Sequence, residues 1–313
     1  VYFLLTDRFK NGDITNDINF DRKEKAAVLR GFEGGDLRGI IQKIDDNYFS
    51  DLGINAIWMT PIVEQIHGAT NEGTGNTYGF HGYWTKDWTE LDPNFGTKKD
   101  LKELVEKAHH KGIRIVLDAV VNHTGPVTKS DPVYPNSWVR TSPTCNYQNY
   151  QNTTACTLVA NLPDILTESS EPTALPKILI DKWKKEGKYE SEMKSLDAFF
   201  ARTGYPRAPK YYIMKWLADY VENYGIDGYR VDTVKHTNED VWKDFQKICQ
   251  ESFDIFKRNN PSKVLDNNLF FTVGEVYGYG ISQKQIYDFG DKKVNYYQNG
   301  FKSLINFDFK GDA

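Results

Sequence analysis

Short apolar runs alternate with helical patterns along this chain. The runs are rich in Val, Ile and Phe and nearly continuous in apolar character, which is typical of strands buried on both faces of a parallel sheet. They lie at residues 1–9, 55–62, 114–122, 228–233, 269–277 and 303–309. Residues 98–112 and 211–225 instead place apolar side chains at helical spacing, and both segments end at a glycine. This alternation predicts an α/β fold built on a parallel sheet.

The connection after the third run is far longer than an ordinary loop between a strand and a helix. It is rich in Pro, Ser, Thr and Asn, and it contains one helical pattern near 176–200. We interpret residues 124–204 as an inserted subdomain. Residues 1–123 and 205–313 then form one catalytic domain around the sheet.

Polar side chains gather where the apolar runs end. They are Asp118, Asn122, Arg230, Asp232, Glu275 and Asp308. Ligands bind at this end of the strands both in (β/α)8 TIM barrels and in doubly wound sheets. No glycine-rich phosphate loop follows the first run, which argues against a doubly wound dinucleotide-binding fold. A barrel needs eight strands and the pattern supplies six, so we expect a (β/α)8 barrel that is incomplete in this chain.

Arg230 and Asp232 lie two residues apart in a buried strand, so their side chains point to the same face. Buried charges are costly unless they are paired or used, which leaves a structural ion pair or the floor of an active site. Glu275 follows the next apolar run, so it should lie on the neighbouring strand end. Two carboxylates so placed are what glycoside hydrolysis requires. The alternative is a pair of structural strand-end carboxylates.

The surroundings of the two carboxylates suggest different protonation states. Arg230 favours the ionised form of Asp232 through its charge and hydrogen bonding. Glu275 follows the apolar stretch "FFTVG", which disfavours its charge and helps to keep it protonated. Asp232 would then serve as the nucleophile and Glu275 as the acid.

Five segments resemble the signature regions of the alpha-amylase family of retaining glycosidases, in the order expected for that family. They are residues 81–97, 118–123, 162–164, 228–236 and 274–276. The inserted segment looks closest to that of periplasmic bacterial alpha-amylases. The resemblance implies a TIM barrel that hydrolyses internal α-1,4-glucosidic bonds of starch, glycogen and maltodextrins. The alternatives are a glucanotransferase or cyclodextrin-acting member, which uses the same acids, and a non-catalytic glucan-binding relative, which usually lacks one of them.

The resemblance assigns residues to both sides of the scissile bond. Asp232 matches the nucleophile, Glu275 the general acid/base and Arg230 the arginine that orients the nucleophile. On the side of the cleaved sugar the matching residues are Tyr83, Trp84 and His123, and on the leaving-group side they are Lys235 and His236. Taken singly, Tyr83 and Trp84 would be read as core aromatics, His123 could be a strand-end histidine and Lys235 a surface lysine.

The same resemblance implies a Ca²⁺ site formed by Asn122, Asp164 and the backbone carbonyl of His236. Oxygen donors from separate segments suit this ion, which would tie the inserted subdomain to the barrel. Taken alone, Asn122 would be read as a loop-capping residue. In fungal relatives a carboxylate near the second cysteine also binds calcium. This chain has Thr153 and Thr154 there, so we expect weaker binding through carbonyls or water.

The cysteines indicate an oxidising compartment. Cys145 and Cys156 flank a polar loop, and we expect a disulfide between them, the alternative being two free loop thiols. Cys249 lies in an amphipathic pattern and reads as a core residue. We therefore expect a periplasmic or secreted protein, although no signal peptide is visible. The chain opens without Met and reads as if trimmed at its N-terminus.

Composition narrows the choice of partners. A net charge of −4 without a basic block argues against nucleic acid, and no apolar run is long enough to span a membrane. Aromatic residues make up 14% of the chain, and their flat faces suit sugar rings. We expect a monomer.

In the alpha-amylase family the seventh strand supplies a His-Asp pair, whose Asp is a third essential carboxylate. Nothing in this chain matches that pair. We therefore expect a fragment that is poorly soluble and inactive alone.

Overall fold

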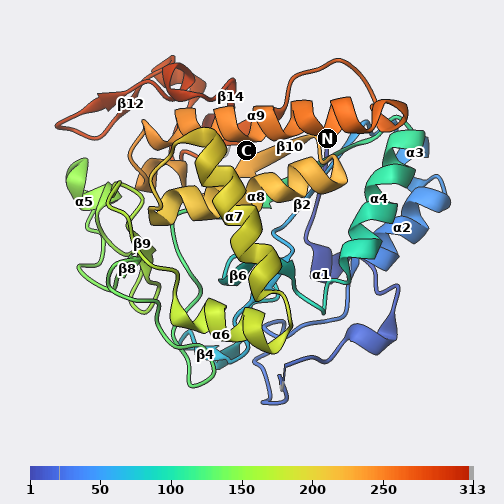
Figure 1. Cartoon of the computed structure of the whole chain (residues 1–313), viewed down its shortest axis with the longest axis horizontal. Coiled ribbons are helices and arrows are strands. Elements are labelled where there is room, and N and C mark those ends of the chain that lie inside the picture. Colours follow the sequence, from blue (N-terminus) through green and yellow to red (C-terminus); the bar gives the residue numbers. More distant parts are fainter. Residues whose placement is uncertain (21, 310–313) are drawn as a thin grey trace.

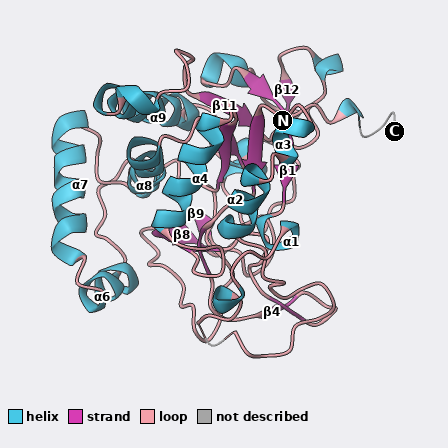
Figure 2. Ribbon diagram, turned by 90° about the vertical axis from the view of Figure 1, so that its right-hand side faces the viewer, coloured by secondary structure: helices cyan, strands magenta, loops and turns pink. Residues whose placement is uncertain are grey.

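The computed structural model describes residues 1–20 and 22–309, so the last residues of the predicted barrel segment lie outside it. Within this part, six parallel strands form one curled sheet whose strand order equals chain order (Figures 1 and 2). They are β1 (Tyr2–Leu4), β2 (Ala56–Met59), β7 (Arg114–Ala119), β10 (Gly228–Val231), β11 (Phe271–Gly274) and β14 (Ser303–Leu304). The predicted incomplete (β/α)8 barrel is therefore confirmed.

The strands are shorter than the apolar runs that predicted them. The first run holds only a three-residue strand, and the helix α1 (Thr6–Phe9) follows it directly. The concave side of the sheet encloses a cavity of about 600 Å³ that Trp58, Val116 and Val273 help to line.

The helices on the outside of the sheet follow their sequence signals. They are α2 (Leu37–Asp45), α3 (Tyr48–Asp51), α4 (Lys98–His110), α8 (Pro209–Tyr224) and α9 (Val241–Asn259). Thr97 and Asp100 form a capping box at the start of α4, and Gly225 ends α8 with a φ of 73°, which favours glycine. Cys249 is buried in α9, as expected of a core residue.

Several short strands lie outside the main sheet. The strand β6 (Thr85–Leu91) pairs antiparallel with β3 (Val63–Gln65), and neither was predicted. The other antiparallel pairs are β4 (Thr70–Asn71) with β5 (Asn76–Thr77) and β12 (Tyr287–Asp288) with β13 (Lys293–Val294). These hairpins place loops around the carboxyl ends of the barrel strands.

Near residues 176–200, where the sequence indicated one helical piece, the structure has two helices. The helix α6 (Lys177–Lys185) is separated from α7 (Tyr189–Thr203) by a turn in which Gly187 has a φ of 69°. Residues 124–204 also hold α5 (Gln151–Thr154) and a pairing of β8 (Val139–Arg140) with β9 (Asp164–Ile165). The predicted disulfide between Cys145 and Cys156 is present. The boundaries of a separate subdomain stay a prediction.

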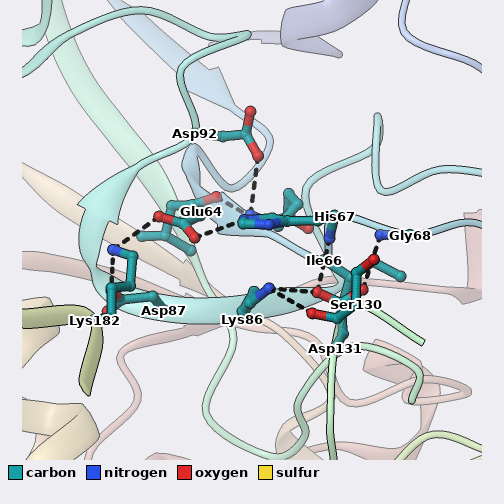
Figure 3. A network of polar contacts seen from close by, with 12 residues as sticks. Glu64, Ile66, His67, Gly68, Lys86, Asp87, Asp92, Ser130, Asp131 and Lys182 are labelled. Atoms are coloured by element: carbon teal, nitrogen blue, oxygen red, sulfur yellow. Dashed lines mark hydrogen bonds and ion pairs between the residues drawn. The ribbon is translucent and has the colours of Figure 1, made fainter. Parts of the chain in front are cut away.

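Charged contacts dock α6 onto the β3–β6 hairpin (Figure 3). Lys182 lies 3.0 Å from Glu64 and 2.7 Å from Asp87, both of which are buried. On the other side of the hairpin, Lys86 reaches Asp131 at 2.7 Å. These buried pairs fix the inserted segment relative to the barrel. No helix in residues 1–20 and 22–309 is long and apolar enough to cross a membrane.

Candidate active site

The register of the sheet brings the strand-end charges together. In the pairing of β7 with β10, Asp118 lies opposite Arg230. In the pairing of β10 with β11, Val231 lies opposite Gly274, so Asp232 and Glu275 leave the sheet side by side. Parallel strands in register therefore place the carboxylates at the same edge.

Arg230 is the centre of a buried network of three carboxylates. Its Nη1 donates to Asp118 Oδ1 at 2.9 Å and to Asp232 Oδ1 at 2.7 Å. Its Nη2 lies 2.8 Å from Glu275 Oε1. Arg230, Asp118 and Asp232 are buried, whereas the Glu275 side chain keeps 21% of its surface exposed. The bridging guanidinium holds Asp232 and Glu275 facing one another, with Glu275 nearer to solvent.

Thr233, which directly follows Asp232, has an unusual backbone conformation. Thr233 has a φ of 49°, in the left-handed region that β-branched residues rarely adopt. The resulting turn directs the Thr233 N–H to Glu275 Oε2 at 3.1 Å, and the Val234 N–H to the Glu275 carbonyl at 3.0 Å. Strained backbone of this kind persists where the surroundings hold it in place. It fixes the Glu275 carboxyl group beside the end of β10.

Burial and neighbouring charges shift the pKa values of three groups in the network. Burial raises the pKa of Glu275, and the nearby charge of Asp232 raises it further, against the opposing effect of Arg230. Burial also raises the pKa of Asp118, to about 7. For Arg230, burial alone would lower the pKa, but the charges of Asp118 and Asp232 outweigh it and raise the pKa. The site therefore combines a permanent cation with a carboxyl group that tends to hold its proton.

A family model described as "Alpha amylase, catalytic domain" matches residues 3–306, almost the whole chain. The chain belongs to the alpha-amylase family. The periplasmic alpha-amylase of Escherichia coli K12 is 34% identical over 368 aligned residues, covering 100% of this chain and 50% of that protein. A cyclomaltodextrin glucanotransferase of Geobacillus stearothermophilus is 31% identical over 237 residues, covering 75% of this chain and 30% of that protein.

Solved structures of the alpha-amylase family share the fold. An Anoxybacillus alpha-amylase superimposes with a TM-score of 0.66 at 27% identity, covering 99% of this chain and 52% of that chain. The chain thus spans about half or less of the length of these relatives. The family resemblance seen in the sequence is confirmed.

Two of the three residues predicted beside the cleaved sugar lie at the network. Tyr83 donates its hydroxyl hydrogen to Asp118 Oδ2 at 2.8 Å, and its backbone carbonyl lies 3.1 Å from His123 Nε2. Burial lowers the pKa of His123 to about 4, so the ring is neutral and its buried Nδ1 has no hydrogen-bond partner. Trp84 packs against Ile66 and Leu162, and its role at the sugar stays a prediction.

Lys235 and His236 follow Asp232 in a short 3-10 turn, and both are buried. Lys235 Nζ donates to the Tyr277 carbonyl at 2.9 Å and to the Tyr287 hydroxyl at 3.1 Å. His236 Nδ1 lies 3.1 Å from the Thr153 carbonyl. A carbonyl can only accept, so Nδ1 carries the hydrogen and Nε2 is left as an acceptor in the neutral ring.

Two of the residues predicted to bind calcium, Asn122 and Asp164, lie side by side. The Asn122 carbonyl accepts from the Ile165 N–H at 2.8 Å, which sets Asn122 beside Asp164. Asp164 Oδ2 accepts from Arg140 at 2.7 Å, while its buried Oδ1 and the Asn122 Nδ2 have no partner. In the described part of the chain, no group of three or more His, Cys, Asp and Glu side chains could hold a metal. Any metal here would depend on amide and backbone oxygens.

Sequence reasoning did not assign a role to Asp118, although the residue opens one of the family segments. The structure shows it accepting from Arg230, Tyr83 and also Trp58, whose Nε1 lies 3.2 Å away. The signal that could have identified Asp118 is a charged residue inside an apolar strand, which is the signal that identified Arg230. Asp308 makes a different contact: its Oδ2 accepts from the Ser282 N–H at 2.9 Å.

Proposed function

We propose that the full-length protein hydrolyses internal α-1,4-glucosidic bonds of glucans such as starch, glycogen and maltodextrins, with retention of configuration. The observation that carries this proposal is the bridging of Asp232 and Glu275 by one buried guanidinium at neighbouring strand ends. Membership of the alpha-amylase family supports it. In a retaining enzyme the two carboxyl groups lie about 5–5.5 Å apart.

In the first step, Asp232 attacks the anomeric carbon and forms a covalent bond to the sugar. Glu275 donates its proton to the glycosidic oxygen as the bond to the leaving sugar breaks. Arg230 Nη1 donates to Asp232 Oδ1 at 2.7 Å and so orients the nucleophile. Burial raises the pKa of Glu275, so its carboxyl group can hold the proton that it transfers to the leaving oxygen.

In the second step, Glu275 is ionised and removes a proton from a water molecule. The resulting hydroxide attacks the anomeric carbon, and the bond to Asp232 breaks. Glu275 regains its proton and Asp232 its charge. Tyr83 and the neutral His123 are placed to contact the sugar that carries the reacting carbon.

Replacing the acids individually tests this proposal. We expect Asp232→Asn and Glu275→Gln in the full-length protein each to lower kcat on maltoheptaose by at least about a thousandfold, because catalytic groups act as a unit. Asp308→Asn is the matched control and should keep its activity. Proton NMR should show the α-anomer as the first product. Retained activity in Asp232→Asn would contradict the assignment.

Transfer to a second glucan is the alternative reaction, and one relative is a cyclomaltodextrin glucanotransferase. Both reactions share the first step and differ in whether water or a sugar hydroxyl attacks the covalent intermediate. We propose hydrolysis, because the relative that covers the whole chain is an alpha-amylase. Incubating the protein with maltoheptaose and excess glucose would reveal transfer as products longer than the substrate.

We also propose that Ca²⁺ binds at Asn122, Asp164 and the His236 carbonyl. Asp164 Oδ1 is a buried carboxyl oxygen without a hydrogen-bond partner, which a hard cation would satisfy. When bound, the ion would link the inserted segment to the barrel. Chelation should lower the melting temperature of the full-length protein, and Ca²⁺ but not Mg²⁺ should restore it. An unchanged melting curve would count against the site.

The disulfide supports a periplasmic or extracellular location, and the E. coli relative is named as periplasmic. Fractionation of the native host, with immunodetection of the protein in the periplasm and medium, tests this proposal.

A further inference from the structure

Three segments that are distant in the sequence meet around Tyr150, which lies in the loop closed by the disulfide. The Tyr150 hydroxyl donates to Glu239 and to Asn238 Oδ1 at 3.2 Å, just before α9. Its backbone N–H donates to Asp291 Oδ1 at 2.8 Å, in the turn between β12 and β13. Figure 1 shows α5 and β12 at the same end of the molecule.

A cation completes the arrangement. Lys292 Nζ lies 3.7 Å from the centre of the Tyr150 ring and 2.7 Å from Glu239 Oε1. Phe289 packs edge-on against the same ring, with 5.1 Å between ring centres. We name Tyr150, Glu239, Asp291 and Lys292 the Tyr150 clasp. It joins the inserted segment, the hairpin and the start of α9 by direct contacts.

Both sides of the Tyr150 clasp continue to residues beside the acids. On the hairpin side, Tyr287 contacts Phe289 and accepts from Lys235 at 3.1 Å. On the loop side, the Thr153 carbonyl accepts from His236 Nδ1, and the Tyr147 ring lies 5.7 Å from the His236 ring. Lys235 and His236 therefore receive their orientation from two segments that the clasp holds together.

We propose that the Tyr150 clasp is a specificity-determining device that positions Lys235 and His236 for the leaving-group part of a long α-glucan. This inference rests on the proposed function, which puts the leaving group on this side. The clasp residues act as positioning residues and do not touch the scissile bond. Exposed rings of Tyr147 and Tyr277 on the same side offer stacking faces for further sugars.

The proposal predicts a dependence on substrate length. A substrate with sugars beyond the scissile bond needs correctly placed Lys235 and His236, whereas an activated aryl glycoside leaves without reaching them. Opening the clasp should therefore raise KM for the first substrate and leave the second unaffected. One weakened hydrogen bond to the sugar corresponds to a change of roughly five- to tenfold.

The experiment compares maltoheptaose with 2-chloro-4-nitrophenyl maltotrioside, using the full-length protein. In Tyr150→Ala we expect KM for maltoheptaose to rise about five- to tenfold with kcat changed less than twofold. Tyr150→Phe, which keeps the ring over Lys292, should show a smaller rise. Kinetics on the aryl glycoside should stay unchanged in both. Tyr205→Phe is the matched control, because its hydroxyl also binds a carboxylate, Asp244, at 3.2 Å.

Charge-reversal variants distinguish the opening of the clasp from a general folding defect. Lys292→Glu should raise KM for maltoheptaose, and the double variant Glu239→Lys with Lys292→Glu should restore part of it, because the swap remakes the ion pair but not the hydrogen bond from Tyr150 to Glu239. Equal losses on both substrates, no loss on either, or no rescue would overturn the inference. Asp232→Asn is assayed alongside, because full activity in that variant would overturn the proposed function itself, whereas its inactivity leaves the clasp to be judged alone.

Discussion

Removing Arg230 should make the stability of this protein depend strongly on pH. The change Arg230→Met keeps the length of the side chain and deletes the guanidinium. It leaves Asp118, Asp232 and Glu275 in place without the cation that contacts all three at 2.7–2.9 Å. Because two of these carboxylates are buried, solvent cannot replace the lost partner.

The contacts set the size of the effect. Breaking a buried pair by removing one partner costs about 3–5 kcal/mol, since a buried charge is left uncompensated. For a chain of 313 residues, that corresponds to a fall in melting temperature of roughly 5–8 °C. The remaining carboxylates can lower the cost by taking up protons, so the fall depends on pH.

The direction of the pH dependence follows from the pKa values. Without the cation, the pKa values of Asp118 and Glu275 rise further above their unfolded values, which are 3.8 for Asp and 4.5 for Glu. A group whose pKa is raised by folding contributes stability that is present below the unfolded pKa and is lost as pH rises through the folded pKa. The deficit of Arg230→Met should therefore be small at pH 5 and large at pH 8.

Differential scanning calorimetry of both proteins at pH 5 and pH 8 measures this deficit. Arg22→Met is the matched control, because Arg22 is also buried and, among the described residues, pairs with one carboxylate, Asp92, at 2.7 Å. Its deficit should change less between the two pH values. The reasoning is refuted if Arg230→Met loses the same stability at both pH values, or if its pH dependence does not exceed that of Arg22→Met.

Two further predictions concern the acid and the disulfide. Because burial and Asp232 raise the pKa of Glu275 above its ordinary 4.5, the basic limb of kcat/KM should lie above that pH, and a limb at or below it would contradict the acid role. Replacing Cys145 and Cys156 by serine should lower the free energy of unfolding of the full-length protein by about 2–4 kcal/mol, because the unfolded chain gains conformational freedom. Denaturant unfolding measures this change, and an unchanged midpoint would contradict it.

The sequence predicted the site better than its surroundings. Apolar runs that end in charged residues located Asp232 and Glu275, because a parallel sheet places all strand ends at one edge. The role of Asp118 was missed, because it follows from the register between two strands that are far apart in the chain. The β3–β6 hairpin lies outside the main sheet and lacks the continuous apolar character that marked the barrel strands.

Other features depended on contacts with no local pattern. Tyr150 meets Glu239 and Asp291 across long stretches of chain, and nothing near Tyr150 in the sequence points to either. Trp84 was assigned beside the sugar from the family resemblance alone, and its packing against Ile66 and Leu162 joins segments that are far apart in the chain.

The identity of strand order and chain order has a consequence during synthesis on the ribosome. Each barrel strand pairs with the strand made just before it, so the sheet can grow as the chain emerges. About a hundred residues separate the end of β7 at Ala119 from the start of β10 at Gly228. At about 5–20 residues per second, the edge of β7 waits roughly 5–20 s for its partner. An unpaired edge can pair with other chains, so this interval is when the nascent protein is most exposed to aggregation and most in need of a chaperone.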